Sequence, residues 1–359
     1  MHHHAFELTQ ALLTRLRREA ERASYRAAER YRRDGDARGF VCETHQELPA
    51  QPPPNRRTLV FFAHFDLQGI VDPYVAYYLE ALRGIGATIV FVSGSPTLTP
   101  ESVAPIRSHC AGIYTRRTLS LDFGSWHLAW CILRQRGWSL DQFDRFVIAN
   151  DSVFGPLFPL EEMWSSFHAA DMYGAIENTQ IVPHLQSFFL AWDLNSRTRP
   201  FLNDFWNDFQ YVVHKGTLIW RYEIGLTKRA RKAGLSVKPF VSAATIKTTY
   251  GRSSAHLWAG RSGRNNGTLY FWDGLIEDFR FPFLKTILPR YNKPWHESMA
   301  HLRDVIEQHT PYPYRLIQSN VDRLGCGVPS LVRLTRYALP TGRWIPPKAR
   351  RTCSPRAGG

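Results

Sequence analysis

Asn150, Asp151 and Ser152 are the residues whose types and spacing first suggest chemistry. They follow an apolar run, residues 146–149, that has the length of a buried strand, and a Gly-Pro pair then turns the chain. Asn and Asp are common in turns, so a simple turn is one interpretation. The other is a site for a metal ion or a sugar nucleotide, because ligands of α/β proteins bind at the carboxyl ends of strands.

Polar side chains follow the other predicted strands as well, which favours a shared ligand-binding rim. The carboxyl ends of parallel strands meet at one edge of a sheet, so these groups are expected to lie close together. Gly, Ser and Asp also make turns, and that interpretation stays open for each strand end. The polar strand ends are His64-Phe65-Asp66, Ser93-Gly94-Ser95, Asp122-Phe123-Gly124-Ser125-Trp126, Asn150-Asp151-Ser152 and Glu177-Asn178.

A carboxylate at a strand end suits a divalent cation such as Mg²⁺ or Mn²⁺. Proteins bind Mg²⁺ through one or two carboxylates together with the phosphates of the substrate. Asp151 is the predicted metal ligand, with Asn150 and Ser152 beside it. The alternative is that Asp151 only caps the turn that follows it.

A reaction at a neutral hydroxyl group also needs a general base, which is usually a Glu, Asp or His side chain. The candidates are Glu223, His184 and Asp193. Glu223 is expected at the start of a helix, where a carboxylate is also favourable for purely electrostatic reasons. His184, in the run Pro-His-Leu-Gln-Ser, is equally consistent with a half-buried structural histidine.

The sequence lacks the motifs of several other enzyme classes. It has no G-x-G-x-x-G segment after the first predicted strand and no Walker loop, which disfavours dinucleotide oxidoreductases and P-loop enzymes. It has no G-x-S-x-G elbow and no H-E-x-x-H pair, so neither motif indicates a hydrolase.

Alternating strands and helices must position these side chains. Apolar runs bounded by turn residues predict the strands, and Asp72 as N-cap with Pro73 in the first turn predicts the start of the first core helix. This alternation predicts an α/β protein with a mostly parallel sheet covered by helices on both faces. The predicted strands are 58–64, 87–95, 110–117, 143–151, 171–178 and 185–193, and the helices are 72–86, 125–138, 159–170, 199–209, 222–234 and 294–310.

The chain of 359 residues divides into four predicted parts. Residues 1–48 are a basic helical extension with a helix at 5–33, and residues 49–57 are a Pro-rich linker. Residues 58–292 are the main domain, and residues 293–359 form a C-terminal helix with a basic tail.

The net charge of +14 is concentrated at the two ends of the chain. Residues 15–33 carry +5 and residues 333–356 carry +7, so the middle is nearly neutral. This pattern argues against nucleic-acid binding by the core and suits an anionic membrane surface. A solvated helix face and a frayed tail explain it equally well.

Five scattered cysteines without a C-x-x-C pair favour a reducing compartment. The sequence has no apolar run of the roughly 18 residues that a membrane span needs, and the N-terminus shows no signal region. We therefore predict a cytoplasmic protein, with peripheral attachment to the inner face of the cytoplasmic membrane as an extension of that prediction.

Several of these segments together resemble the rhamnan synthesis F family of bacterial polysaccharide glycosyltransferases. The resemblance covers roughly residues 58–292, and the basic ends lie outside it. The segments that carry it are VFFAHFDLQGIVDPYVAYYLEAL, LDFGSWHLAW, IANDSVFGPLFPLEEM, PHLQSFFLAW, YEIGLTKRARKAG and WDGLIEDFRFPFLKTIL.

The resemblance implies transfer of a sugar, typically L-rhamnose from dTDP-L-rhamnose, to a growing lipid-linked glycan of a cell-surface polysaccharide or O-antigen. The order of elements is also distantly similar to the GT-A plan of family-2-like glycosyltransferases. That similarity implies a single Rossmann-type sheet, with Asp151 at the metal and diphosphate and Glu223 as the base. The chain departs from it at Gly225, where a second Asp would stand, and in having a single acid in Asn-Asp-Ser.

Residue roles follow from this resemblance for an inverting displacement. Glu223 and His184 are the expected catalytic residues, and Asp151 is the expected metal ligand. Two other classes remain open: a metal-independent GT-B glycosyltransferase and a non-catalytic glycan-binding assembly protein. The residues expected to bind the sugar nucleotide are His64, Asp66, Ser93, Asp122, Gly124, Asn150, Asp151 and Gln186.

Overall fold

The computed structural model describes residues 41–55, 57–116, 120–179, 182–212, 215–250, 266–290 and 301–324. All of them belong to the first of two units, Met1–Gly327 and Val328–Gly359. The predicted basic helix at 5–33 and the basic tail lie outside the described residues.

A nine-stranded sheet in the order β1-β4-β3-β2-β5-β9-β7-β10, with β8 paired to β7, forms the centre of the described fold. β2, β3, β4 and β5 run parallel, β9 enters antiparallel between β5 and β7, and β10 is parallel to β7. The predicted mostly parallel sheet is therefore confirmed. The strands are β1 Val41–Gln46, β2 Thr58–His64, β3 Ala87–Ser93, β4 Gly112–Arg116, β5 Arg145–Asn150, β7 Met172–Asn178, β8 His184–Leu185, β9 Phe189–Asp193 and β10 Val237–Val241.

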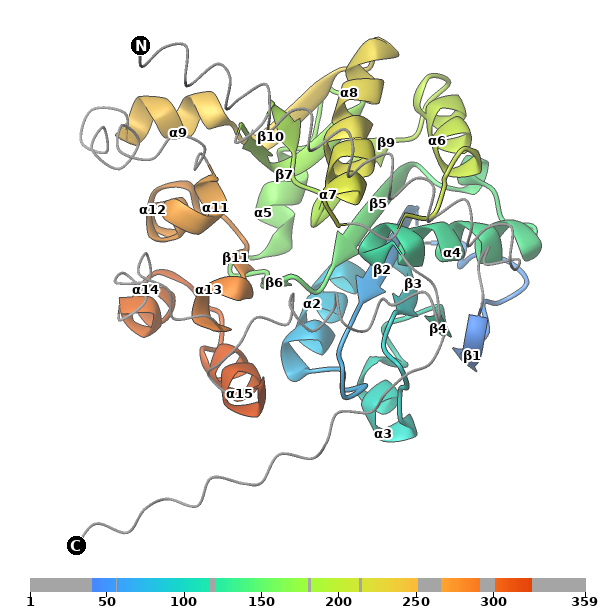
Figure 1. The fold of residues 1–359 in the computed structure, drawn as a ribbon, viewed down its shortest axis with the longest axis horizontal. Coiled ribbons are helices and arrows are strands. Elements are labelled where there is room, and N and C mark those ends of the chain that lie inside the picture. Colours follow the sequence, from blue (N-terminus) through green and yellow to red (C-terminus); the bar gives the residue numbers. More distant parts are fainter. Residues whose placement is uncertain are drawn as a thin grey trace, which may run out of the picture. The chain divides into compact units, whose positions relative to one another are not determined.

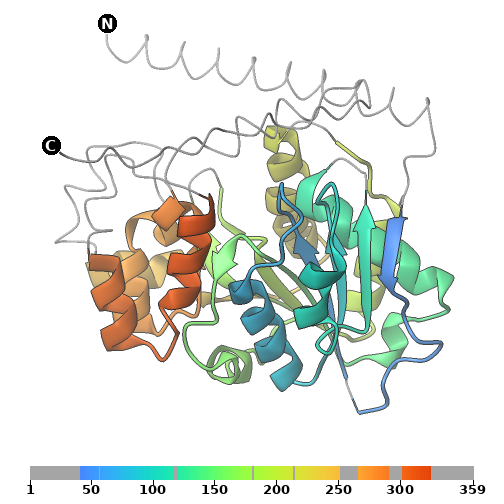
Figure 2. The same cartoon turned by 90° about the horizontal axis from the view of Figure 1, so that it is seen from below.

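Helices cover both faces of this sheet, as predicted (Figures 1 and 2). Along β2, Val60 and Phe62 enter the core beneath α2, whereas Phe61 and Ala63 enter the core beneath α4. A strand buried on both faces reads as a continuous apolar run, which is why β2 was recognisable. The helices are α2 Pro73–Gly84, α3 Pro100–Val103, α4 Leu121–Gln135, α5 Leu160–Ser165, α6 Thr198–Asn207, α7 Lys215–Leu218, α8 Ile224–Lys232, α9 Ala243–Tyr250, α11 Gly267–Tyr270, α12 Trp272–Phe279, α13 Ile287–Arg290, α14 Leu302–His309 and α15 Arg315–Leu324.

The direction of winding reverses at β2. From β2 the chain moves outward through β3 to β4, and it then returns to place β5 on the other side of β2. Ala63 pairs with Asn150 at the carboxyl ends of these two central strands. Ligands of open α/β sheets bind at such a switch point, so this edge is where a site is expected.

Several predicted boundaries differ from the observed ones. β1 precedes the predicted linker at 49–57 and pairs with β4, so the sheet extends in front of residue 58. α4 begins at Leu121 instead of residue 125, because the backbone turns at Ser120 through a positive φ of 79°. It ends two residues before Gly137, whose φ of 73° suits a glycine after a helix end.

The predicted strand 185–193 is interrupted into β8 and β9, with Gln186 and Ser187 at the break. The predicted helix 222–234 is also part of a longer helical segment. It begins with α7 and passes through a π-helical turn, Ile219–Glu223, before α8. Glu223 therefore ends a π turn and does not start an isolated helix.

A second, two-stranded sheet pairs β6, Val153–Phe154, with β11, Leu284–Lys285. The helices α12 to α15, coloured orange and red, lie beside this sheet and α2 in both views (Figures 1 and 2). α15 packs against α2. The C-terminal part of the chain thereby reaches the polar edge of the main sheet.

Candidate functional site

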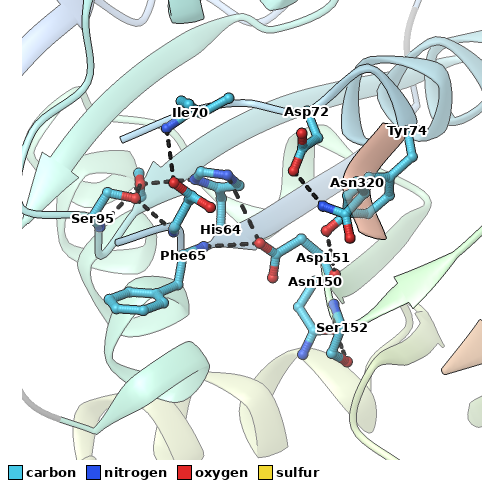
Figure 3. Close-up of polar contacts among 12 residues, drawn as sticks. His64, Phe65, Ile70, Asp72, Tyr74, Ser95, Asn150, Asp151, Ser152 and Asn320 are labelled. Carbon is cyan, nitrogen blue, oxygen red and sulfur yellow. Dashed lines mark hydrogen bonds and ion pairs between the residues drawn. The ribbon is translucent and has the colours of Figure 1, made fainter. Parts of the chain in front are cut away.

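Asp151 lies at the carboxyl end of β5 and faces the end of β2 (Figure 3). Its Oδ2 accepts the backbone N–H of Phe65 at 3.0 Å and lies 3.8 Å from Nε2 of His64. The hydroxyl of Tyr74 donates to the Asp151 carbonyl at 2.9 Å. Burial raises the pKa of the Asp151 carboxyl to about 8, with nearby Asp122 acting in the same direction.

Asn150 joins β5 to the first turn of α4. Its Nδ2 donates to Oδ2 of Asp122 at 2.8 Å, and its Oδ1 accepts the Ser152 N–H and hydroxyl at 3.1 and 2.7 Å. Burial raises the pKa of Asp122, against the opposing effect of the Asn150 hydrogen bond. Gly124 lies in the next part of the same turn, where its N–H reaches the Ser120 carbonyl at 3.0 Å.

These residues do not form a complete metal site by themselves. Both ends of the Asn150 amide are engaged within the protein, which leaves Asp151 as the one carboxylate of the Asn-Asp-Ser run, with Asp122 nearby. Across the described ranges, no three His, Cys, Asp or Glu side chains converge so that they could hold a metal ion. A metal role for Asp151 stays a prediction.

A chain of hydrogen bonds runs along the ends of β2 and β3. Nδ1 of His64 lies 2.9 Å from Oγ of Ser93, the Ser93 hydroxyl donates to Ser95 Oγ at 2.7 Å, and Ser95 Oγ accepts the Asp66 N–H. Burial lowers the pKa of His64 to about 4. The imidazole is therefore neutral near pH 7 and offers one donor and one acceptor nitrogen.

Asp66 is saturated by the protein. Its Oδ1 accepts the N–H groups of Gln68 and Ile70 at 2.8 and 3.1 Å, and its Oδ2 accepts Arg323 of α15 at 2.7 Å. Asp66 thus shapes the loop after β2. Direct contact between Asp66 and a nucleotide stays a prediction.

Asp72 makes no side-chain cap bond at the start of α2, although its position is that of an N-cap. Its carboxylate instead accepts a hydrogen bond from Asn320 at 2.5 Å (Figure 3). It also accepts hydrogen bonds from Arg323 at 2.5 and 3.0 Å. Burial opposes the charge of Arg323, but the hydrogen bonds and the attraction of Asp72 and Asp66 together outweigh it and raise the pKa of Arg323. Arg323 of α15 therefore bonds carboxylates at both ends of the loop between β2 and α2, Asp66 and Asp72.

Glu223 lies against the break between β8 and β9. Its Oε1 accepts the backbone N–H of Ser187 at 3.2 Å. π-Helical turns often mark functional sites, and this one ends at Glu223. A Cβ at Gly225 would lie 3.2 Å from the Trp220 carbonyl, so a larger residue would crowd this turn.

His184 and Gln186 flank the same break. Nδ1 of the buried His184 lies 2.7 Å from the Val182 carbonyl, which can only accept, so the proton sits on Nδ1 and Nε2 carries the lone pair. Gln186 donates from Nε2 to Asn266 at 3.1 Å and accepts the Thr268 hydroxyl at 3.2 Å. Catalysis by His184 and sugar contact by Gln186 stay predictions.

Asp193, the third candidate base, lies elsewhere. It pairs with Arg145, the first residue of β5, at 2.6 Å and accepts the Tyr173 hydroxyl at 3.0 Å. It is therefore at the amino end of β5, at the opposite edge of the sheet from Asp151. The structure therefore separates Asp193 from Asp151, because β9 runs antiparallel to β5 and β7 and ends where those two strands begin.

Lys285 of β11 connects the two groups of predicted residues, and sequence reasoning missed it. Both Glu223 and Asp122 lie close enough to favour its charge, although burial lowers the pKa of Lys285 to about 8. A signal was available: Lys285 is a single charge within the otherwise apolar run FPFLKTIL. Lysine is rarely buried unless it is paired, so such a residue warrants a functional interpretation.

The fold and the site together define an α/β protein with a polar, carboxylate-rich site at the switch point of a mostly parallel sheet. A family model described as rhamnan synthesis protein F matches residues 89–340, well over half of the chain. The chain belongs to the rhamnan synthesis protein F family, a family of polysaccharide-synthesis proteins. The resemblance noted from the sequence is thereby confirmed.

No curated protein matches the sequence significantly. Similar solved structures include a Desulfovibrio desulfuricans G20 protein assigned as a nucleotide-diphospho-sugar transferase, with TM-score 0.34, 12% identity and coverage of 71% of this chain and 98% of that one. A mannosyltransferase from Pyrobaculum calidifontis in complex with GDP-Man and Mn²⁺ has TM-score 0.33, 12% identity and coverage of 91% and 89%. The galactosyltransferase LgtC has TM-score 0.29, 11% identity and coverage of 72% and 99%. Likeness at these scores supports no functional conclusion by itself.

Proposed function

We propose that this protein is a glycosyltransferase that moves a sugar from a nucleoside-diphosphate donor to a glycan acceptor. Membership in a polysaccharide-synthesis family supports the substrate class. The observation that carries the proposal is the cluster of polar side chains at the carboxyl ends of β2 and β5, where His64 lies 3.8 Å from Asp151 and Asn150 donates to Asp122. Asp122 comes from α4 beside Asn150, and Glu223 comes from the π turn.

The reaction is a displacement at the anomeric carbon. The acceptor hydroxyl oxygen forms a new bond to that carbon, while the bond to the diphosphate oxygen breaks and its electron pair leaves with the diphosphate. Glu223 accepts the proton of the acceptor hydroxyl, and the ends of β2 and β5 hold the nucleoside side of the donor. The outcome of a single displacement is inversion at the anomeric carbon.

The finer proposal names the substrates. The donor is dTDP-L-rhamnose, and the acceptor is a growing lipid-linked cell-surface polysaccharide or O-antigen. His64, Ser93 and Gln186 then line the donor site. The family description, rhamnan synthesis, supports rhamnose as the transferred sugar.

The first test is thermal unfolding against a panel of nucleoside diphosphates, each with Mg²⁺, Mn²⁺ or EDTA. A ligand present at about 100 times its dissociation constant stabilises the folded state by about 2.7 kcal/mol, a clear shift in the unfolding temperature. We expect dTDP to give the largest shift, and dependence on added metal would support a metal role for Asp151.

Other outcomes of the panel separate the competing classes. A dTDP shift that is the same in EDTA would leave the glycosyltransferase proposal standing and favour a metal-free site, as in the GT-B alternative. No shift with any nucleoside diphosphate would contradict the proposal and favour a non-catalytic glycan-binding protein. The matched control is the corresponding nucleoside, which lacks the diphosphate.

The lipid-linked acceptor implies work at a membrane surface. No described helix has the length and apolarity to cross a membrane. The basic segments 15–33 and 333–356 lie outside the described residues, and we expect them to attract anionic lipid by about 1 kcal/mol per Lys or Arg near the surface.

Liposome sedimentation tests this attraction. We expect the full chain to sediment with anionic vesicles at low salt and to be released as the salt concentration rises, because salt screens surface charge. Equal sedimentation with neutral vesicles would contradict an electrostatic attachment. A chain lacking residues 333–359 is the comparison, and it should bind anionic vesicles more weakly.

A further inference from the structure

Lys285 is held at the site by a short strand pairing. It lies opposite Val153, and the neighbouring Thr286 N–H donates to the Ser152 carbonyl at 3.0 Å. The Thr286 hydroxyl also reaches this carbonyl at 3.2 Å, across 134 residues of sequence. Lys285 is therefore anchored opposite Val153, which comes two residues after Asp151 and just past the end of β5.

The side chain of Lys285 is fixed from a second direction. Its Nζ lies 4.1 Å from the centroid of the Phe188 ring. The Phe188 carbonyl accepts the backbone N–H of Asn150 at 3.3 Å, so the ring belongs to the same strand end. The Lys285 side chain is thus held next to Phe188, beside the carboxyl end of β5.

The charges around Lys285 are arranged on three elements. Glu223 of the π turn and Asp122 of α4 favour the ammonium, Lys215 of α7 opposes it, and burial lowers its pKa to about 8. Within the ranges that the structure describes, no carboxylate forms an ion pair with it. Lys285 is partly exposed, and a cation that is partly withdrawn from water without an ion-pair partner costs some stability.

We propose that Lys285 binds the diphosphate of the donor and neutralises the negative charge that develops there as the glycosidic bond breaks. This inference rests on the proposed function. The electron pair of the broken bond goes to the diphosphate oxygen, the acceptor proton goes to Glu223, and Lys285 keeps its own proton. A positioned cation at a leaving group acts mainly by electrostatic stabilisation of the transition state.

Calorimetric titration of the full chain tests the proposal with dTDP, thymidine and inorganic diphosphate as probes. Lys285→Met should weaken binding of dTDP and of inorganic diphosphate by about 10- to 100-fold, the range expected for loss of a charge-assisted hydrogen bond. Thymidine binding should not change. Lys285→Arg should retain most of the affinity for diphosphate because it keeps the charge. Lys238→Met, which removes an exposed lysine from β10, is the matched control and should bind like the parent protein.

Thermal unfolding of the same variants separates binding from a structural role. The pKa of Lys285 in the folded protein lies below that of a free lysine. The charge of this partly buried ammonium therefore costs stability at pH 7, and the cost is relieved as the pH rises from about 8 towards the ordinary lysine value of 10.5. Lys285→Met should be at least as stable as the parent at pH 7. A purely structural lysine would instead show lower stability with unchanged diphosphate affinity.

The outcomes distinguish this inference from the proposed function. If the parent binds dTDP and Lys285→Met binds dTDP and inorganic diphosphate equally well, the role of Lys285 is overturned and the glycosyltransferase proposal stands. If the parent binds neither dTDP nor any other nucleoside diphosphate, both are overturned. If Lys285→Met binds diphosphate more weakly and is as stable as the parent, the result supports both the glycosyltransferase proposal and the role of Lys285.

Discussion

Replacing Glu223 by Gln is expected to lower the rate of sugar transfer by about 10²- to 10⁴-fold at saturating donor, the usual contribution of a positioned general base. Gln has nearly the same shape and keeps an oxygen that can accept the Ser187 N–H, which Glu223 now accepts at 3.2 Å. The fold and the affinity for dTDP should therefore stay unchanged. Single-turnover transfer from dTDP-L-rhamnose to a lipid-linked glycan acceptor is the measurement, with dTDP affinity recorded in parallel.

The matched control is Glu80→Gln, which changes an exposed carboxylate of α2 in the same way. Its transfer rate should stay within a few-fold of the parent. A Glu223→Gln rate that is also within a few-fold would show that the base assignment is wrong. His184→Gln is then the next variant, because Nε2 of His184 carries the lone pair that a base needs.

Replacing Arg323 by Met is expected to destabilise the fold by about 3–5 kcal/mol, the cost of removing one partner from a buried ion pair. The Arg323 side chain is 19% exposed, and it bonds Asp66 and Asp72, which are 10% and 8% exposed. Its removal leaves two nearly buried carboxylates without their cation. Thermal and urea unfolding at pH 7 should both show the loss.

A triple variant sharpens this test. Changing Asp66 and Asp72 to Asn together with Arg323→Met removes all the charges, and we expect most of the lost stability to return because no buried carboxylate is left unpaired. Arg303→Met is the control, since Arg303 is 67% exposed and its ion pair with Glu307 is worth less than about 1 kcal/mol. If Arg323→Met and Arg303→Met unfold at the same temperature and urea concentration, the ion pairs of Arg323 contribute little to stability.

Much of the fold could be predicted because the information is local. Strands β2 and β3 are buried on both faces and read as continuous apolar runs. Pro73 in the first turn of α2 is a boundary signal that the chain carries by itself. The alternation of these elements was enough to predict a mostly parallel sheet covered on both faces.

The parts that local reasoning missed depend on pairings between distant segments. The break between β8 and β9 has no sequence mark of its own, since the run from Leu185 to Asp193 reads as one strand. The antiparallel direction of β9 follows from its partners β5 and β7. That direction carries Asp193 to the edge of the sheet opposite Asp151.

The candidate site divides in the same way. Polar residues after apolar runs marked His64, Asp122 and Asp151, because parallel strands place their carboxyl ends together wherever the sheet forms. The sequence could not show that the loop after β2 and Arg323 of α15 together occupy the two carboxylate oxygens of Asp66. Nor could it show that the Asn150 amide is used at both ends.

The sequence by itself determined the class of sheet, the family and the strand ends where polar groups gather. Only the tertiary structure decided which further residues join them. Arg323 and Asp66 are 257 residues apart, and Thr286, beside Lys285, is 134 residues from Ser152. Local propensity acts over a few neighbouring residues, whereas these contacts form only after the whole chain has packed, so no short segment can encode them.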